Sequence, residues 1–271
     1  MGPRPCRCLI QGCCKEGLFS SPCWMLHLSC RSKANPCRRR SKIAPQNLRF
    51  NCTGLKYLEP MYSSIAIEGG IGAGKSTLAT WLAQDLGAEC MLERFEENPF
   101  LEKFYENPDA YGFSVELSFL ADRYKQMQQA ILGRNLFKQR LVCDYAFAKS
   151  LIFAKVNLPK EEFDLFKTMF QMMAAQLPSP EVIAILDPGR AQQEAQILAR
   201  GRSYEQALPE GYLDRVAKGY EQHFKHARGS RVLWIDTSGV DFVARPEEKM
   251  ALRDLILAPR KPGVHRLVAG S

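Results

Sequence analysis

The chain has 271 residues, of which 46% are hydrophobic and 24% charged, as in ordinary globular proteins. No run of 18 apolar residues occurs, so we expect no membrane-spanning helix and no membrane partner. The net charge of +8 comes from residues 1–60, which carry 11 Lys/Arg and two acidic residues, whereas residues 61–271 carry 26 Lys/Arg and 27 Asp/Glu. This nearly neutral main part argues against binding to a nucleic-acid polymer, which requires a clustered basic face.

The first 60 residues form a basic, cysteine-rich leader. They contain eight of the ten cysteines but no pair of CxxC units, so neither zinc nor a disulfide framework is indicated. Three interpretations stay open: an organelle transit segment, a disordered tail, or a translation start placed too far upstream. Met61 directly precedes the first convincing strand. We therefore expect a folded domain over residues 61–271, located in the cytoplasm unless the leader directs import into an organelle.

From Met61 onward, short apolar runs alternate with longer helical patterns. The expected strands are 65–68, 90–93, 141–144, 182–186 and 232–236. The expected helices are 76–86, 113–132, 161–176, 191–199, 209–224 and 246–257. Alternation of this kind predicts βαβ units, hence an α/β domain with a five-stranded parallel sheet and helices on both faces.

The segment after the first expected strand matches G-x-x-x-x-G-K-[ST] at every fixed position. Glycine lets backbone N–H groups turn toward phosphate oxygens, and the following helix adds its positive end. Lys75 is expected to reach the β- and γ-phosphates, and the Ser76 hydroxyl to bind Mg²⁺. The motif predicts a P-loop NTPase fold, a three-layer sandwich, that uses ATP and Mg²⁺. The expected ATP-phosphate contacts are Gly69, Gly70, Ile71, Gly72, Ala73, Gly74, Lys75, Ser76 and Thr77.

Two carboxylates are expected at the carboxyl ends of strands, where ligands bind in open α/β sheets. Glu93 ends the second expected strand and is a candidate to accept a proton from an attacking hydroxyl. Asp144 ends the third and is a candidate Mg²⁺ ligand. No guanine-reading N-K-x-D follows the loop, so a GTPase is not indicated, and the size fits a small-molecule kinase best.

Four blocks, "IEGGIGAGKSTLA", "LER…NPFLEKFYENP", "FSVELSFLADRY" and "ARGRSYEQALPEGYL", occur in the order found in deoxynucleoside kinases. The chain resembles this family, most closely its bacterial members, from Met61 to the C-terminus. The resemblance implies phosphorylation of a deoxyribonucleoside 5′-hydroxyl in nucleotide salvage. It also implies a homodimer formed through helices.

Carried over position by position, the resemblance makes Glu93 the general base and assigns Tyr105 and Glu205 to the sugar 3′-hydroxyl. Glu116 stands where many relatives carry a base-reading glutamine. An ionised carboxylate only accepts hydrogen bonds, which favours adenine, cytosine or guanine over thymine. Arg123 lies seven residues further on the same helix face, either near the base or neutralising Glu116. Phe153 matches an aromatic residue that stacks on the base.

The resemblance further assigns Arg200 and Arg202 to a lid that closes over the transferring phosphoryl group. Two departures stand out. Relatives often have an arginine directly after the acidic residue of the third strand, whereas Tyr145 follows Asp144 here. Gln196 replaces a positive charge found in some relatives, so Arg200 and Arg202 are expected to supply more of the positive charge that stabilises the transferring phosphoryl group. The segment "IDTSGVDF" resembles the loop that meets the donor base.

The sequence therefore predicts an ATP- and Mg²⁺-dependent deoxynucleoside kinase. Two alternatives stay open: a nucleoside monophosphate kinase, which needs a basic pocket for the acceptor phosphate, and a non-catalytic ATP-binding regulatory protein that uses the leader as a binding arm.

Overall fold

The computed structural model describes residues 63–132, 140–202 and 208–270, and these residues belong to one compact unit. The strands are β1 (Ser64–Gly69), β2 (Glu89–Met91), β3 (Leu141–Cys143), β4 (Val182–Asp187), β5 (Arg231–Asp236) and β6 (Gly263–Val268). The helices are α1 (Lys75–Leu86), α2 (Leu101–Glu106), α3 (Pro108–Leu132), α4 (Lys149–Asn157), α5 (Lys160–Ala174), α6 (Arg190–Arg200), α7 (Tyr212–Phe224) and α8 (Pro246–Leu257), with a 3₁₀ turn η1 at Phe95–Glu97.

The six strands form one parallel sheet in the order β2-β3-β1-β4-β5-β6. β1 lies inside the sheet between β3 and β4, and the chain crosses from one side of β1 to the other between β3 and β4. A crevice forms at the carboxyl ends of strands where the order reverses in this way, and ligands of α/β proteins bind there. The topology therefore directs attention to the loop that follows β1.

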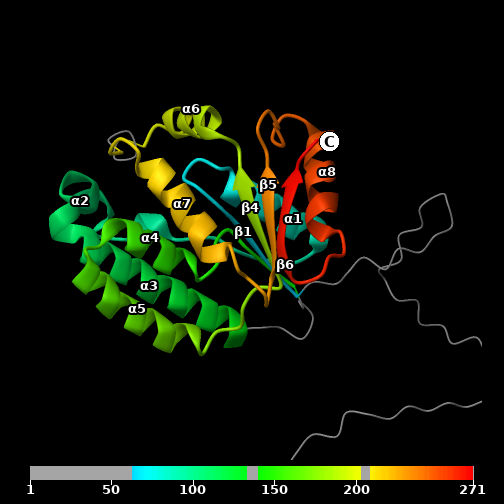
Figure 1. Cartoon of the computed structure of the whole chain (residues 1–271). Coiled ribbons are helices and arrows are strands. Elements are labelled where there is room, and N and C mark those ends of the chain that lie inside the picture. Colours follow the sequence, from blue (N-terminus) through cyan, green and yellow to red (C-terminus); the bar gives the residue numbers. More distant parts are fainter. Residues whose placement is uncertain (1–62, 133–139, 203–207, 271) are drawn as a thin grey trace, which may run out of the picture. The chain divides into compact units, whose positions relative to one another are not determined.

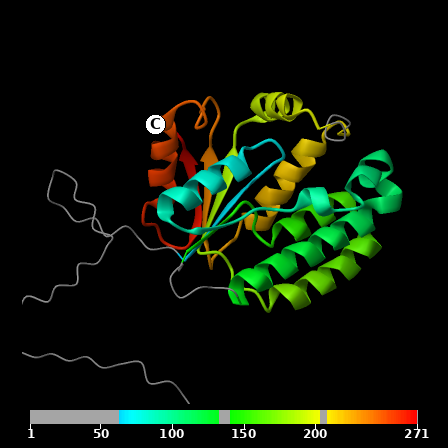
Figure 2. The ribbon, with the colours of Figure 1, turned by 180° about the vertical axis from the view of Figure 1, so that it is seen from behind.

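Helices cover both faces of the sheet, as Figures 1 and 2 show. On one face, α1 and α8 pack on the sheet through side chains such as Leu78, Leu82 and Leu252. On the other face, α4, α6 and α7 supply Ile152, Ile197 and further apolar residues. A third apolar cluster joins α3, α4 and α5 beside this second layer. The expected three-layer α/β sandwich is confirmed.

Three details differ from the expected elements. The sheet has six strands, not five, because β6 adds an edge strand whose residues alternate between partly buried and exposed and include His265 and Arg266. Edge strands of this kind lack the continuous apolar run that marks a buried parallel strand. The short helices α2 and α4 were not expected, and β2 ends at Met91, so Glu93 lies two residues beyond the strand.

No helix of the described residues is both long and apolar enough to cross a membrane. The leader, residues 1–60, lies outside the described residues.

Candidate active site

The predicted phosphate loop connects β1 to α1. Gly74 has φ +79°, and a Cβ at this position would lie 2.6 Å from Cζ of Phe242, so both the backbone and the space require glycine. α1 begins directly afterwards at Lys75, with no side chain capping its first turn. Its first backbone N–H groups are therefore available to an anion, in agreement with the phosphate site that the motif predicts.

A cavity of about 390 Å³ opens beside this loop, a size that suits a small organic ligand. It lies between the carboxyl ends of the strands and helices α2, α3 and α4. Eleven of the predicted site residues line it: Ile71, Lys75, Ser76, Glu93, Tyr105, Glu116, Arg123, Asp144, Phe153, Arg200 and Arg202. Glu205 lies outside the described residues.

The two predicted metal ligands meet at the phosphate end of the cavity. The Ser76 hydroxyl donates to Oδ2 of Asp144 at 2.5 Å, and the backbone N–H of Glu93 donates to Oδ1 at 2.8 Å. Lys75 donates its ammonium to the carbonyl of Gly70 at 2.7 Å. Burial, followed by repulsion from Lys149, lowers the pKa of Lys75 to about 8, although nearby carboxylates oppose the shift. A bound anion would favour the charged ammonium.

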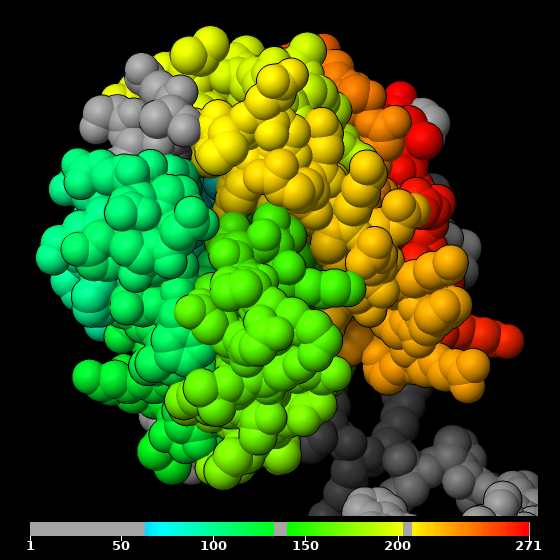
Figure 3. Space-filling model, turned by 60° about the vertical axis from the view of Figure 1, so that its left-hand side comes forward, coloured from blue at the N-terminus to red at the C-terminus, as the bar shows by residue number. Residues whose placement is uncertain are grey.

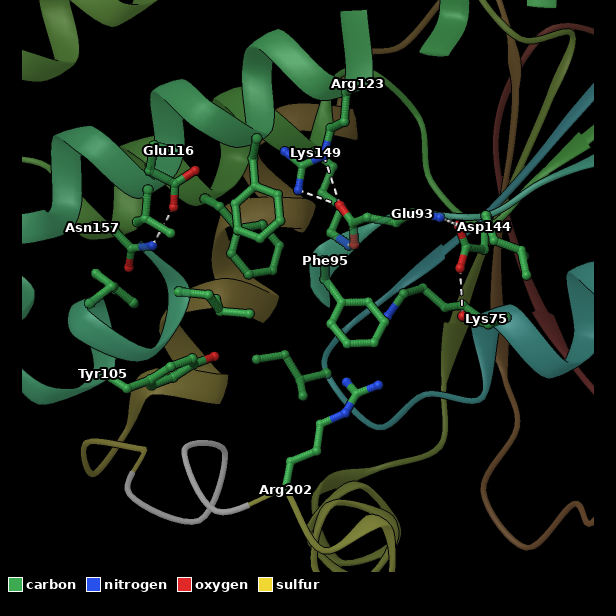
Figure 4. A pocket seen from close by; sticks show the side chains of 18 of the residues that line it. Lys75, Glu93, Phe95, Tyr105, Glu116, Arg123, Asp144, Lys149, Asn157 and Arg202 are labelled. Carbon is green, nitrogen blue, oxygen red and sulfur yellow. Dashed lines mark hydrogen bonds and ion pairs between the residues drawn. The ribbon is translucent and has the colours of Figure 1, made fainter. Parts of the chain in front are cut away.

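Glu93 is held by two cations. Arg123 donates Nε and Nη2 to Oε1 of Glu93, at 2.8 and 2.5 Å, and Lys149 donates Nζ to Oε2 at 2.5 Å. Figure 4 shows this cluster beside Asp144. Burial alone would raise the pKa of Glu93, but the charges of Arg123 and Lys149 outweigh it and hold the pKa well below the usual range. Glu93 is therefore an ionised, oriented carboxylate.

Among the described residues, Arg123 donates hydrogen bonds to Glu93 and not to Glu116, although its charge also acts on Glu116. Besides its two bonds to Glu93, its Nη1 donates to the hydroxyl of Ser150 at 2.8 Å. The sequence left open whether Arg123 lies near a base or neutralises Glu116. Its hydrogen bonds among the described residues join α3 to Glu93, two residues beyond β2, and this contact depends on tertiary packing.

Glu116 lies at the opposite end of the cavity from the phosphate loop (Figure 4). Its Oε1 accepts a hydrogen bond from Nδ2 of Asn157 at 2.6 Å, while its buried Oε2 has no hydrogen-bond partner among the described residues. Burial raises the pKa of Glu116 to about 7, against the lowering effect of Arg123 and Asn157. A buried polar atom without a partner is costly, so a ligand group is expected to meet it.

Tyr105 and Phe153 line the walls between these two ends. Phe104 is the buried aromatic residue of α2, whereas its neighbour Tyr105 is half-buried and faces the cavity. Phe153 lies on α4, with Lys149 5.6 Å from its ring centre and Tyr220 packed edge-on. Both aromatic rings therefore offer surface to a ligand, as the resemblance implies.

Arg200 and Arg202 approach the cavity from the end of α6. Arg200 is the last residue of α6, and Gly201 follows with φ +71°, which turns the chain toward Arg202. The guanidinium of Arg202 lies 3.8 Å from the ring centre of Phe95, as Figure 4 illustrates. Both arginines thus line the cavity.

Sequence reasoning missed Lys149 and Asn157, although a signal was present. Lys149, Phe153 and Asn157 are spaced four residues apart, so they share one face of a helix. The resemblance assigns Phe153 to the base, and a helix over residues 149–157 places Lys149 and Asn157 on the same face. Phe95 and Tyr212, which also line the cavity, carried no comparable signal.

A second hollow of about 270 Å³ lies against the segment after β5 and is lined by Gln192, Gln196 and residues 239–243. It contains the part of "IDTSGVDF" expected to meet the donor base. Gln192 accepts a hydrogen bond from the N–H of Gly239 and donates one to the carbonyl of Val240, both at 3.3 Å.

The phosphate loop, the parallel sheet and the oriented carboxylate together define a P-loop phosphotransferase that uses a nucleotide. The chain belongs to the deoxynucleoside kinase family, because the family model for deoxynucleoside kinase matches residues 65–257. The prediction of an enzyme that phosphorylates deoxynucleosides in nucleotide salvage is therefore confirmed at the level of the family.

Relatives and solved structures agree with this membership. The chain is 34% identical to the deoxyguanosine kinase of Bacillus subtilis over 183 residues, which cover 66% of this chain and 88% of the relative. It is 28% identical to the deoxyguanosine kinase of Lactobacillus johnsonii over 211 residues, or 73% and 92% of the two chains. The structure of deoxyadenosine kinase from M. mycoides with bound dATP matches with a TM-score of 0.54 and 28% identity, over 60% and 84% of the two chains.

Proposed function

We propose that this protein transfers the γ-phosphoryl group of ATP to the 5′-hydroxyl of a deoxyribonucleoside, giving the 5′-monophosphate and ADP. The observation that carries the proposal is the position of the Glu93 carboxylate on the cavity wall, next to Asp144 and the phosphate loop. An acceptor in the cavity can present its hydroxyl to Glu93 while a triphosphate occupies the loop. Proximity and orientation of this kind supply much of the catalysis in phosphoryl transfer.

The acceptor is proposed to lie along the cavity with its 5′-end toward Glu93 and its base toward Glu116. Tyr105 would then face the sugar and contact the 3′-hydroxyl, together with Glu205, and Phe153 would stack on the base. The walls between the ends are largely apolar and aromatic, as in many small-molecule sites.

Glu93 is proposed to orient the hydroxyl and to receive its proton late in the transfer. The two cations that depress its pKa make it a weak base in the free enzyme. Phosphoryl transfer proceeds through a loose transition state, so a strong base is not required before the bond to phosphorus forms. The fixed direction of the carboxylate matters more than its basicity.

Ser76 and Asp144 are proposed to hold Mg²⁺ with the ATP phosphates. Their two oxygens are in contact at 2.5 Å, and Mg²⁺ in kinases is bound by few protein oxygens together with phosphates and water. When bound, the ion would neutralise phosphate charge. Activity is expected to vanish when EDTA removes divalent ions and to return on addition of MgCl₂; activity that persists in EDTA would refute this assignment.

Guanine is proposed as the preferred base. Its Watson–Crick edge presents two adjacent donors, N1–H and the 2-amino group, and an ionised Glu116 with an unpartnered Oε2 can accept both. Adenine and cytosine present an acceptor beside their amino group, which an ionised carboxylate would oppose. Four of the seven relatives are deoxyguanosine kinases and three are deoxyadenosine or deoxyadenosine/deoxycytidine kinases, so the choice of guanine rests on Glu116 and not on the relatives.

The preference for deoxyguanosine over deoxyadenosine, expressed as the ratio of kcat/KM values, is expected to rise between about pH 6 and pH 8. The pKa of Glu116, raised to about 7, makes the side chain a donor and acceptor below this pH and an acceptor only above it. Arg123, Glu93, Lys149 and Tyr212 are the other ionisable groups that act on this carboxyl. Steady-state assays of both nucleosides across this range measure the ratio.

In Glu116→Gln the ratio is expected to fall roughly tenfold at pH 8, equivalent to about 1.4 kcal/mol, and to lose its dependence on pH. The matched control is Glu106→Gln, an exposed position at the end of α2, which should behave as wild type. An unchanged, pH-dependent ratio in Glu116→Gln would mean that Glu116 does not read the base.

A panel of the four deoxynucleosides and their monophosphates tests the function itself. With ATP and Mg²⁺, the protein starting at Met61 is expected to release ADP with deoxynucleosides, deoxyguanosine fastest, and not with monophosphates. Consumption of monophosphates alone would refute the proposed acceptor in favour of a monophosphate kinase. Tight ATP binding without turnover would favour the regulatory alternative.

A homodimer in the cytoplasm is also proposed. Leu165 and Met172 of α5 have exposed fractions of 57% and 68%, so this helix, whose outer surface faces the viewer in Figure 3, offers apolar side chains to a second copy. Light scattering measures the molar mass, and cell fractionation with N-terminal sequencing tests the location and the fate of residues 1–60.

A further inference from the structure

The lining cations are not equally available to an acceptor oxygen at Glu93. Lys75 donates to the carbonyl of Gly70 inside the phosphate loop. Arg123 uses Nε, Nη1 and Nη2 on Glu93 and Ser150. Tyr145, which follows Asp144, supplies no cation, and its hydroxyl donates to Oε1 of Gln126 at 2.7 Å.

Lys149 differs from these residues. Its side chain is only 9% exposed, and it lines the cavity from the first turn of α4. Among residues 63–132, 140–202 and 208–270, its ammonium donates one hydrogen bond, to Oε2 of Glu93. An ammonium has three N–H donors, so Lys149 has donors to spare at the oxygen of Glu93 that Arg123 does not use.

This arrangement limits where an acceptor hydroxyl can meet Glu93. Oε1 already accepts two N–H groups from Arg123, whereas Oε2 accepts one from Lys149. A carboxylate oxygen accepts about two hydrogen bonds, so the hydroxyl is directed to Oε2. There the attacking oxygen comes within reach of the Lys149 ammonium.

We propose that Lys149 is a catalytic residue that donates a hydrogen bond to the 5′-oxygen of the acceptor, holding it between the ammonium and Oε2 of Glu93. The hydroxyl donates a hydrogen bond to the Glu93 carboxylate, which only accepts, and accepts one from the Lys149 ammonium, which only donates. The ammonium then stabilises negative charge that develops on the oxygen as its O–H bond breaks and its bond to phosphorus forms. This inference rests on the proposed function.

The first test compares kcat and KM of Lys149→Met, Lys149→Arg and wild type on the preferred deoxynucleoside. Lys149→Met is expected to lower kcat about 100-fold with a smaller change in the KM for ATP, and Lys149→Arg to recover at least about tenfold of the loss. Lys155→Met is the matched control, since Lys155 lies on the same helix but is exposed and contacts Gln222. It should stay within about twofold of wild type.

The second test separates contact with the 5′-oxygen from support of the fold. Dissociation constants are measured by calorimetry for the deoxynucleoside and its 2′,5′-dideoxy counterpart, which lacks that oxygen. Lys149→Met is expected to weaken binding of the deoxynucleoside about tenfold and to leave the analogue nearly unchanged. Equal changes for both ligands would overturn the proposal, as would a kcat within about threefold of wild type.

Lys149→Gln replaces Lys149→Met in both tests if thermal unfolding shows that the methionine variant is not folded. The experiments distinguish a failure of the proposed function from a failure of the proposed role of Lys149. Wild type that phosphorylates no deoxynucleoside overturns the proposed function and this inference together, whereas active wild type with an equally active Lys149 variant overturns this inference alone.

Discussion

Replacing Glu93 by glutamine is expected to lower kcat for deoxynucleoside phosphorylation by about 10²–10⁴, the range for loss of a positioned proton acceptor. The amide cannot receive the proton and its nitrogen would face the donors of Arg123 and Lys149, which now hold Glu93 through both oxygens. ATP affinity is expected to change little, because the phosphate loop keeps its own contacts. Steady-state kinetics and ATP titration provide the measurement.

Stability must be measured alongside, because Glu93→Gln leaves two cations near each other without their shared carboxylate. Breaking a buried ion pair from one side costs about 3–5 kcal/mol, so the thermal midpoint is expected to fall. Glu97→Gln is the control: this carboxylate lies four residues further on and its side chain is 67% exposed. A folded Glu93→Gln variant with kcat within tenfold of wild type would exclude Glu93 as the proton acceptor.

The second large effect is expected from the arginines at the end of α6. Arg202→Gln is expected to lower kcat by about 10³–10⁵, the range for an arginine that stabilises charge on a transferring phosphoryl group. Arg200→Gln should act in the same direction. Binding of the deoxynucleoside alone should change little, because this charge develops only during the transfer. Single-turnover kinetics with saturating ATP isolate this step.

Arg190→Gln is the matched control for these variants. Arg190 begins the same helix, is exposed and pairs with Glu194 and Asp214 away from the cavity. It is expected to retain wild-type kcat. A loss of less than tenfold in both Arg200→Gln and Arg202→Gln would show that neither guanidinium stabilises the transferring group. The absence of a positive charge at Gln196 would then have no consequence for catalysis.

Much of the site was predictable because its parts are local. The phosphate loop depends on glycines and a helix start that are adjacent in sequence, so the motif predicts its position directly. Asp144 and Ser76 could be paired because both follow strands, and the carboxyl ends of parallel strands share one edge of the sheet. The same reasoning identified Glu93, although the strand before it ends at Met91.

Contacts between elements were not predictable in the same way. The helix face of Arg123 predicts that it lies near Glu116 or near a base. The residue to which it donates hydrogen bonds depends on how α3 packs against the segment after β2. Lys149 and Asn157 stayed unnoticed because α4 is short and contains Ile152 and Val156, whose branching suits a strand as well as a helix. The edge strand β6 was not predicted because its residues alternate between partly buried and exposed and include polar side chains.

The amino-acid sequence by itself determined the phosphate loop, the parallel α/β architecture and the family, because these follow from short-range patterns of glycine, charge and apolar spacing. Only the tertiary structure decided that Glu93 shares its two oxygens between Arg123 and Lys149 and that Asn157 leaves one oxygen of Glu116 open. These charges and hydrogen bonds join residues at least 30 positions apart in the chain. Side chains at such separations meet only after the helices have packed on the sheet.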